Sequence, residues 1–127
     1  MPGKHLYEYA VIRVLPRVER EEFFNVGIIL FSKKCNYLKA VYYLNEDKLA
    51  LFSSELDVES LRANLQVFDK ICNWHKDGGP IAMMDVPERF RWLTAVRSSS
   101  IQTSKPHSGF SKDLEETLQR LFQELVM

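Results

Sequence analysis

Glycine and proline are scarce in this sequence, with five of each among 127 residues. Disordered and linker-rich chains are poor in apolar residues, whereas here 46% of the residues are hydrophobic and 12% are aromatic. We therefore expect a folded globular protein. A chain of this length buries about two thirds of its unfolded surface, which predicts a single domain over residues 1–127.

Cysteine is scarce too, since the chain has only Cys35 and Cys72. They lie far apart and lack a neighbouring Cys or His at the spacing of a zinc site. The histidines, His5, His75 and His107, are also scattered. We expect free thiols in a reducing compartment, and neither a metal nor another cofactor.

The chain has no excess of charge of either sign, because its 17 basic residues balance its 17 acidic residues. Nucleic acids and anionic membranes usually recruit basic surfaces, so neither is expected as a partner. Long hydrophobic runs are absent as well, and the longest, residues 26–31, is far below the ~20 residues that span a bilayer. The first residues lack the pattern of a signal peptide, so we expect a cytoplasmic protein.

β-branched and aromatic residues predict three strands near the start of the chain. The first covers residues 7–15, and because both of its faces are largely apolar, with Arg13 the exception on its face, we expect it at the centre of a sheet. Residues 25–31 and 37–44 predict an antiparallel hairpin, with Asn36 at positive φ in its turn. Gly27 interrupts the second strand. We interpret it as a point of close packing, with ligand contact as the alternative.

Apolar residues at every third or fourth position predict helices further on. The clearest helix has about twenty residues, begins at a capping box of Ser54 and Asp57, and stops at residues 78–80. A second is expected from Asp85 to about residue 95, and a third after a cap at Ser111.

The order of these elements predicts the fold class. Residues 97–109 are either a short extra strand or a long loop. The result is an α+β fold, a small antiparallel sheet of roughly three or four strands with about three helices packed on it.

Charged residues are concentrated between the first two predicted strands, in residues 17–25. Glu19 and Glu21 could divide acid and base work or bind a metal, and Arg20 and Asn25 could bind a ligand. A solvated connection is the more common role for such a run, and a structural ion pair is a further alternative.

Hydroxyl and basic side chains are concentrated in residues 97–109. Arg97 could hold an anion through two hydrogen bonds, and Ser98, Gln102 and Ser104 could orient it. His107 is suited to proton transfer, since an unperturbed histidine has a pKa near ~6.5. The segment lacks the glycine-rich loop of nucleotide enzymes, and a solvated loop is the alternative.

Trp92 lies among arginines, including Arg89. This pair could anchor a protein partner or stack on a nucleic-acid base. Helical spacing also fits core packing beside a solvated arginine, which we take as the first interpretation.

The segments YEYAVIRVLPRVEREEFFNVGIILF and GPIAMMDVPERFRWLTAVRSSSIQTSKPHSG, with the leucine-rich end of the chain, resemble a known family. It is a family of small single-domain bacterial proteins classed as a domain of unknown function. The positions that recur in this family correspond here to Tyr9, Arg13, Pro16, Arg17, Glu19, Arg20, Glu21, Asn25, Gly27, Arg89, Phe90, Trp92, Arg97, Ser98, Gln102, Ser104, His107 and Gly109. Genes of this family are often neighbours of genes for HipA-like kinases. The resemblance therefore implies an accessory role with such a kinase as partner, and no established activity.

Three functions are consistent with the sequence. The leading hypothesis is an accessory domain that binds a protein partner, such as a HipA-like kinase, through an exposed apolar or aromatic patch. The second is an enzyme or ligand-binding domain for a phosphate-bearing substrate, with Arg97, His107 and residues 19–21 converging on one pocket. The third is nucleic-acid binding through Arg89, Trp92 and Arg97, which the neutral charge disfavours. A homo-oligomer is compatible with each.

Overall fold

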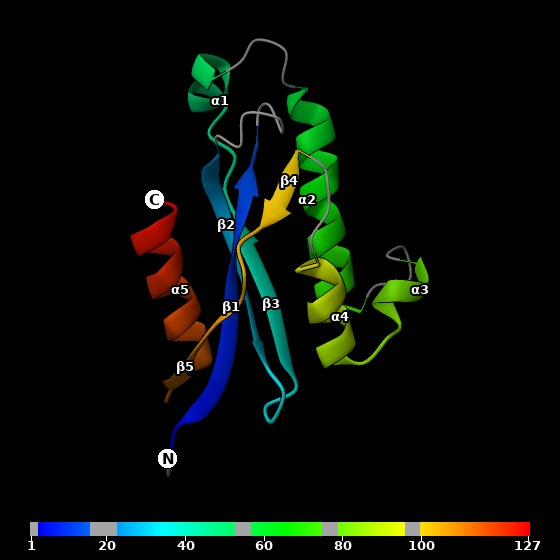
Figure 1. Ribbon diagram of the computed structural model, residues 1–127, viewed down its shortest axis with the longest axis vertical. Coiled ribbons are helices and arrows are strands. Elements are labelled where there is room, and N and C mark those ends of the chain that lie inside the picture. The colour runs from blue at the N-terminus through cyan, green and yellow to red at the C-terminus, as the bar shows by residue number, and fades with distance from the viewer. Residues whose placement is uncertain (1–2, 16–22, 53–56, 75–78, 96–99) are drawn as a thin grey trace.

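The computed structural model describes residues 3–15, 23–52, 57–74, 79–95 and 100–127. Within these ranges a five-stranded antiparallel sheet carries helices on both faces (Figure 1). In chain order the elements are β1 (His5–Val14), β2 (Phe24–Ser32), β3 (Tyr37–Tyr42), α1 (Glu46–Phe52), α2 (Val58–Cys72), α3 (Gly79–Ala82), α4 (Val86–Leu93), β4 (Ile101–Thr103), β5 (His107–Ser111) and α5 (Leu114–Leu125). The predicted α+β class is confirmed.

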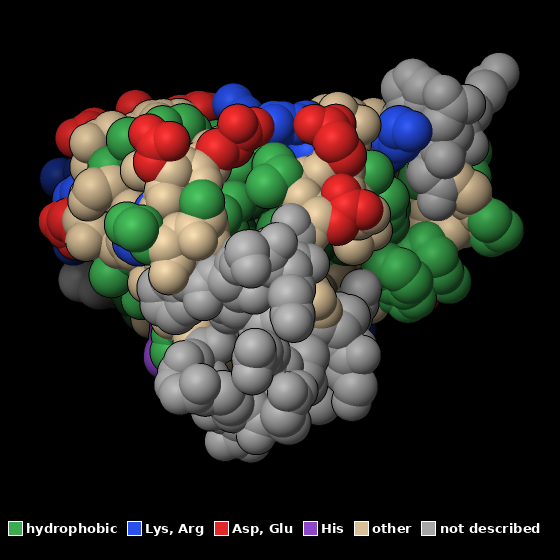
Figure 2. All heavy atoms as spheres, turned by 90° about the horizontal axis from the view of Figure 1, so that it is seen from above, with side chains coloured by type: hydrophobic (Ala, Val, Ile, Leu, Met, Phe, Trp, Pro, Cys, Tyr) green, Lys and Arg blue, Asp and Glu red, His purple; other side chains and the backbone are tan. Residues whose placement is uncertain are grey.

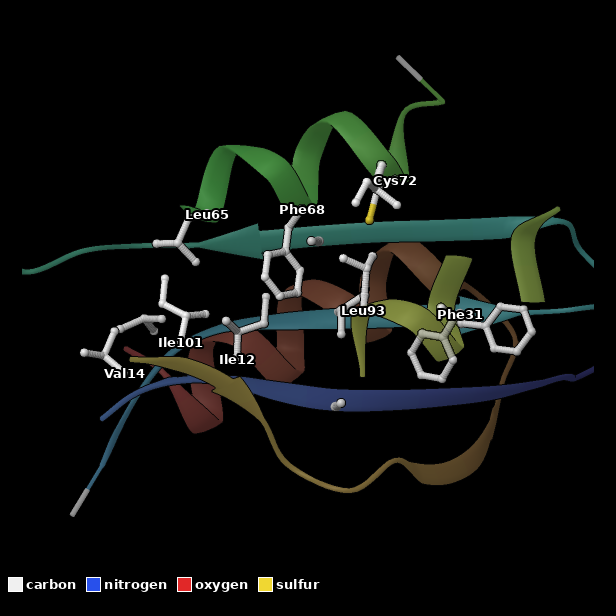
Figure 3. Packing of buried hydrophobic residues seen from close by; sticks show 14 of the residues in the cluster. Ile12, Val14, Phe31, Leu65, Phe68, Cys72, Leu93 and Ile101 are labelled. Atoms are coloured by element: carbon white, nitrogen blue, oxygen red, sulfur yellow. The ribbon is translucent and has the colours of Figure 1, made fainter. Parts of the chain in front are cut away.

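β1 is the central strand, as its two apolar faces predict. One edge pairs with β2, which pairs in turn with β3, and the other edge pairs with β4 and then β5. Ile12 and Val14 on one face pack in a core with residues of α2 and α4, including Leu65 and Leu93 (Figure 3). Val11 on the other face packs in a second core with α5. Helices therefore bury both faces of this strand.

The described residues from 100 to 111 form two short strands, β4 and β5, with an interruption between them. At the interruption, the Ser104 amide donates to the Val11 carbonyl oxygen at 2.8 Å. The Val11 amide donates to Ser104 Oγ at 2.9 Å. The serine side chain thus takes the place of a strand carbonyl and keeps this edge of β1 paired. The sequence left open a short extra strand or a long loop here. The strand is the better description, and the segment forms two strands where one was expected.

The helix boundaries correct several predictions. α2 is shorter than expected, because it is capped by Asp57, which accepts from the Ser60 amide at 3.2 Å, and ends at Cys72. Ser54 lies outside the described residues. α5 is capped by Asp113 rather than Ser111, whose hydroxyl instead donates to the Asp113 carbonyl oxygen. Helices α1 and α3 were not predicted, because they are too short to show an apolar period.

Two other local predictions are confirmed. Asn36 in the β2–β3 turn has a φ of 50°. α4 begins after Asp85, which caps it, and buries Val86, Phe90 and Leu93 on one side.

Two tyrosines of β3 connect this edge strand to helices on opposite faces of the sheet. Tyr37 donates to Glu115 of α5 at 2.7 Å, and Tyr42 donates to Asp69 of α2 at 2.6 Å. Burial, together with the hydrogen bond to Asp69, raises the pKa of Tyr42 to about 12. Both phenols therefore remain protonated donors at neutral pH.

Both cysteines are free thiols, as predicted. Cys35 is exposed, whereas Cys72, the last residue of α2, is buried. Burial raises the pKa of the Cys72 thiol to about 12. Cys72 is therefore a packing residue and not a nucleophile.

Gly27 of β2 lies opposite Tyr42 of β3. A Cβ atom at this position would be 2.5 Å from the Val41 carbonyl oxygen and 2.8 Å from Tyr42 Cβ. The close-packing interpretation is therefore confirmed.

We expect Gly27→Ala to lower the free energy of unfolding by about 1–3 kcal/mol, because the backbone of β3 must move. Urea unfolding followed by circular dichroism measures this loss. Gly109→Ala is the comparison, since its Cβ would be 2.6 Å from the hydroxyl of Tyr7, so that a side chain rather than the backbone of a neighbouring strand must move. We expect a smaller loss there, and an unchanged unfolding midpoint in Gly27→Ala would contradict the argument.

Candidate functional site

A polar row crosses the sheet at the end of β1. Arg13 lies opposite Asn25 of β2 on one side and opposite Gln102 of β4 on the other. The β1–β2 register shifts here, between Ile12 and Arg13. Because side chains alternate along a strand, Arg13 lies on the same face as Val11, the face that α5 covers. This polar row joins Asn25 and Gln102, which belong to the two segments that the sequence singled out.

Two polar atoms of the row, Arg13 Nε and Asn25 Oδ1, are buried and have no hydrogen-bond partner among the described residues. The other end of the Asn25 amide is bound, because Nδ2 donates to the Leu125 carbonyl oxygen at 2.9 Å, at the end of α5. The Arg13 guanidinium lies 4.1 Å from the centre of the Phe23 ring. Unpaired buried polar atoms are rare in native proteins, so this row is a candidate ligand site with one donor and one acceptor to offer.

His107 and Ser104 lie apart from this row. His107 is opposite Tyr9, with the two ring centres 5.3 Å apart. Tyr9 precedes Arg13 by four residues, which corresponds to about 13 Å along a strand. The Ser104 hydroxyl is occupied by the Val11 amide and the Lys105 carbonyl oxygen. The structure therefore does not bring His107 and Gln102 onto one small ligand, and it gives Ser104 a structural role.

The remaining predicted site residues, Glu19, Arg20, Glu21, Arg97 and Ser98, lie outside the described residues. The described ends of their segments do meet, since the Leu15 amide donates to the Ser100 carbonyl oxygen at 2.7 Å. Convergence of these charged side chains on one pocket stays a prediction.

The described residues show neither a cluster of metal ligands nor a membrane-spanning helix. Among the described residues, no group of three or more His, Cys, Asp and Glu side chains is placed to hold a metal. No helix within the described ranges has both the length and the apolar character to cross a membrane.

Arg89 corrects the expectation of a solvated arginine beside Trp92. Its side chain is buried, and Nη1 donates to the carbonyl oxygens of Ile71 at 2.6 Å and Cys72 at 3.1 Å. These carbonyls end α2 and have no partner within that helix. Arg89 therefore fastens α4 to α2 and is largely buried, whereas Trp92 is partly exposed.

Sequence reasoning missed an exposed aromatic surface that follows α2. Trp74 is 60% exposed and Met83 55%, and Met84 is also exposed. Together with Asn36, Asp85, Val86 and Arg89, these side chains line a hollow of about 350 Å³. We call Trp74, Met83 and Met84 the Trp74 surface. Two signals in the sequence could have revealed this surface. Trp74 does not continue the apolar stripe of the helix before it, and Met83 and Met84 are two consecutive methionines.

We expect Arg89→Leu to destabilise the fold by about 1–3 kcal/mol, because two carbonyl oxygens at the end of α2 lose a charged donor. Arg91→Leu is the matched control, since Arg91 is an exposed arginine of the same helix. We expect the control to stay within about 0.5 kcal/mol of the wild type. Thermal unfolding of the two variants compares them, and equal midpoints would show that the buried hydrogen bonds contribute little.

Comparison with known proteins gives a family and no activity. Residues 9–126 match the family model described as "Protein of unknown function (DUF3037)". No curated protein and no solved structure matches the chain. The match reaches from β1 through α5 and so includes the polar row, Arg89 and the Trp74 surface. The chain therefore belongs to the DUF3037 family.

Proposed function

We propose that this protein is a non-catalytic accessory domain that binds a protein partner through the Trp74 surface. The proposal rests on the exposure and the backbone conformation of Trp74. Its indole is 60% exposed, and its backbone has a φ of 57°, in the left-handed region. The fold thus holds a large apolar ring in water and in an unfavourable backbone conformation.

Both features have a free-energy cost that a partner can offset. A left-handed backbone costs a residue other than glycine roughly 1–2 kcal/mol. Strained backbone of this kind is concentrated at binding sites, where the surrounding structure maintains it. Tryptophan is the residue type most enriched among binding hot spots, and the flexible thioethers of Met83 and Met84 can adapt to a bound surface. The hollow between them would accept a side chain of the partner.

The family resemblance makes a HipA-like kinase the first partner to test. A surface of this type needs no catalytic residues, which agrees with the scatter of His107, Ser104 and Gln102 over the sheet. Arg89 contributes indirectly, because it holds the end of α2 from which Trp74 follows.

We expect the purified chain to form a complex with the HipA-like kinase encoded beside it, measured by size-exclusion chromatography and calorimetry. Trp74→Ala should weaken the complex by about 2 kcal/mol, roughly 30-fold, as truncation of a hot spot does. Leu51→Ala is the matched control, because Leu51 is 88% exposed on α1 and lies outside this surface. A chain that ignores the kinase, or a complex equally stable with Trp74→Ala, would contradict the proposal.

The polar row favours a second function, the binding of a phosphate-bearing or other anionic ligand. The buried and unpaired Arg13 Nε carries this alternative, since a guanidinium N–H is a strong donor to an oxyanion. Asn25 Oδ1 could accept from a hydroxyl of the same ligand.

We expect inorganic phosphate to shift the amide resonances of Asn25 and Gln102 in a saturable titration of the labelled chain. Arg13→Gln should abolish these shifts. Arg120→Gln should retain them, because Arg120 is an exposed arginine of α5 outside the row. Shifts that persist in Arg13→Gln, or that are absent from the wild type, would exclude this function.

A further inference from the structure

A second hollow, of about 570 Å³, lies at the end of the sheet where β1 begins. Its floor is apolar. Leu6 of β1 and Phe110 of β5 face each other across the strand pair, and each is about half exposed. Phe31 of β2 lies beside them and stacks on Phe90 of α4, with ring centres 4.8 Å apart. The floor thus offers an exposed apolar surface on a rigid support.

The rim of this hollow is basic. Among the described residues, four cations line it, Lys4 before β1, Lys33 and Lys34 in the β2–β3 turn, and Arg91 on α4, against one carboxylate, Glu8. The salt bridges seen among the described residues involve other cations, Lys39, Arg62 and Arg120. We call this hollow and its rim the basic groove.

The basic groove shows that the zero net charge of the chain is unevenly distributed. The groove lies at the end of the molecule that carries the N-terminus and the β2–β3 turn, at the bottom of Figure 1. Figure 2 looks onto the opposite end, where Asp and Glu side chains stand beside Lys and Arg side chains among hydrophobic ones. The composition alone excluded a basic protein but not a local basic site.

The arrangement of the cations determines which occupant fits best. A small anion would be met by donors that converge on one point, as at a phosphate site. Here the cations come from three separate parts of the chain and surround an open apolar floor. Charge complementarity therefore calls for several negative groups spaced around an apolar group, which a peptide with Asp or Glu flanking an apolar side chain supplies.

We propose that the basic groove binds an acidic peptide segment of a protein partner, with an apolar side chain on Leu6 and Phe110 and carboxylates at the lysines. This inference rests on the proposed function for the source of the peptide, but the groove shares no lining residue with the hollow of the Trp74 surface. The β2–β3 turn lies between the two, because Lys33 and Lys34 line the groove and Asn36 lines the other hollow. One partner can therefore cover both.

The test begins with selection of a random peptide library on the wild-type chain. Selected peptides, synthesised with a fluorescein label, are then titrated by anisotropy. We expect peptides rich in Asp and Glu around an aromatic or aliphatic residue. Their affinity should fall roughly tenfold in Lys34→Glu and should fall as salt is raised. Lys105→Glu is the matched control, because Lys105 is also an exposed lysine and does not line the groove. It should bind as the wild type does.

Several outcomes would overturn the proposal. They are the selection of no peptide, the selection of peptides without acidic residues, and affinities that Lys34→Glu leaves unchanged. A dimer in the ultracentrifuge that Lys34→Glu dissociates would assign the groove to a second copy of the chain instead.

The two proposals can fail separately. Peptides sensitive to Trp74→Ala but not to Lys34→Glu would leave the proposed function standing and remove the groove. Peptides sensitive to Lys34→Glu, with a chain that ignores the kinase, would support the groove and contradict the proposed function.

Discussion

The fold depends on a single strand whose two edges are both paired and whose two faces are both covered. β1 hydrogen-bonds to β2 along one edge and to β4 and β5 along the other, while α2 and α4 cover one face and α5 the other. In such a position almost every side chain must be apolar and every backbone group must find a partner. Ser104 meets the second requirement where the outer strand is interrupted, because its amide and hydroxyl both bond to Val11. Arg13 is an exception to the first near one end of the strand, and His5 and Glu8 lie near the other end, where the strand is less buried.

The connection between α2 and α4 is the second determinant of the molecular surface. The guanidinium of Arg89 binds the last carbonyl oxygens of α2, so it fixes the point at which the chain leaves that helix. Trp74 follows within two residues of Cys72 and is directed into solvent by its left-handed backbone. A buried charge with a purely structural role therefore places the most exposed tryptophan beside the methionines of the segment that precedes α4. α4 itself supplies Arg91 to the basic groove.

The Trp74 surface and the basic groove lie on either side of the β2–β3 turn. One offers a large aromatic ring and flexible thioethers, and the other offers positive charge around an apolar floor. Apolar anchors contribute most of the affinity of an interface, whereas charges at the rim contribute to specificity and to the rate of association. A partner that covered both would therefore gain affinity from one surface and orientation from the other.

The sequence by itself determined the α+β class, the central position of β1, the β2–β3 hairpin with its positive-φ Asn36 and the close approach at Gly27. These features depend on the spacing of apolar residues along each element, on the residue types in a turn, and on the burial of both faces of a single strand. Each of these leaves a pattern in residues that are neighbours in the sequence. Only the tertiary structure decided that Asn25 and Gln102 flank Arg13, that His107 lies apart from them, and that Arg89 is buried. Strand register and the contact of one helix end with another helix join residues far apart in the chain, so no local pattern records them. The basic groove has the same origin, because its cations come from three separate parts of a chain with no net charge.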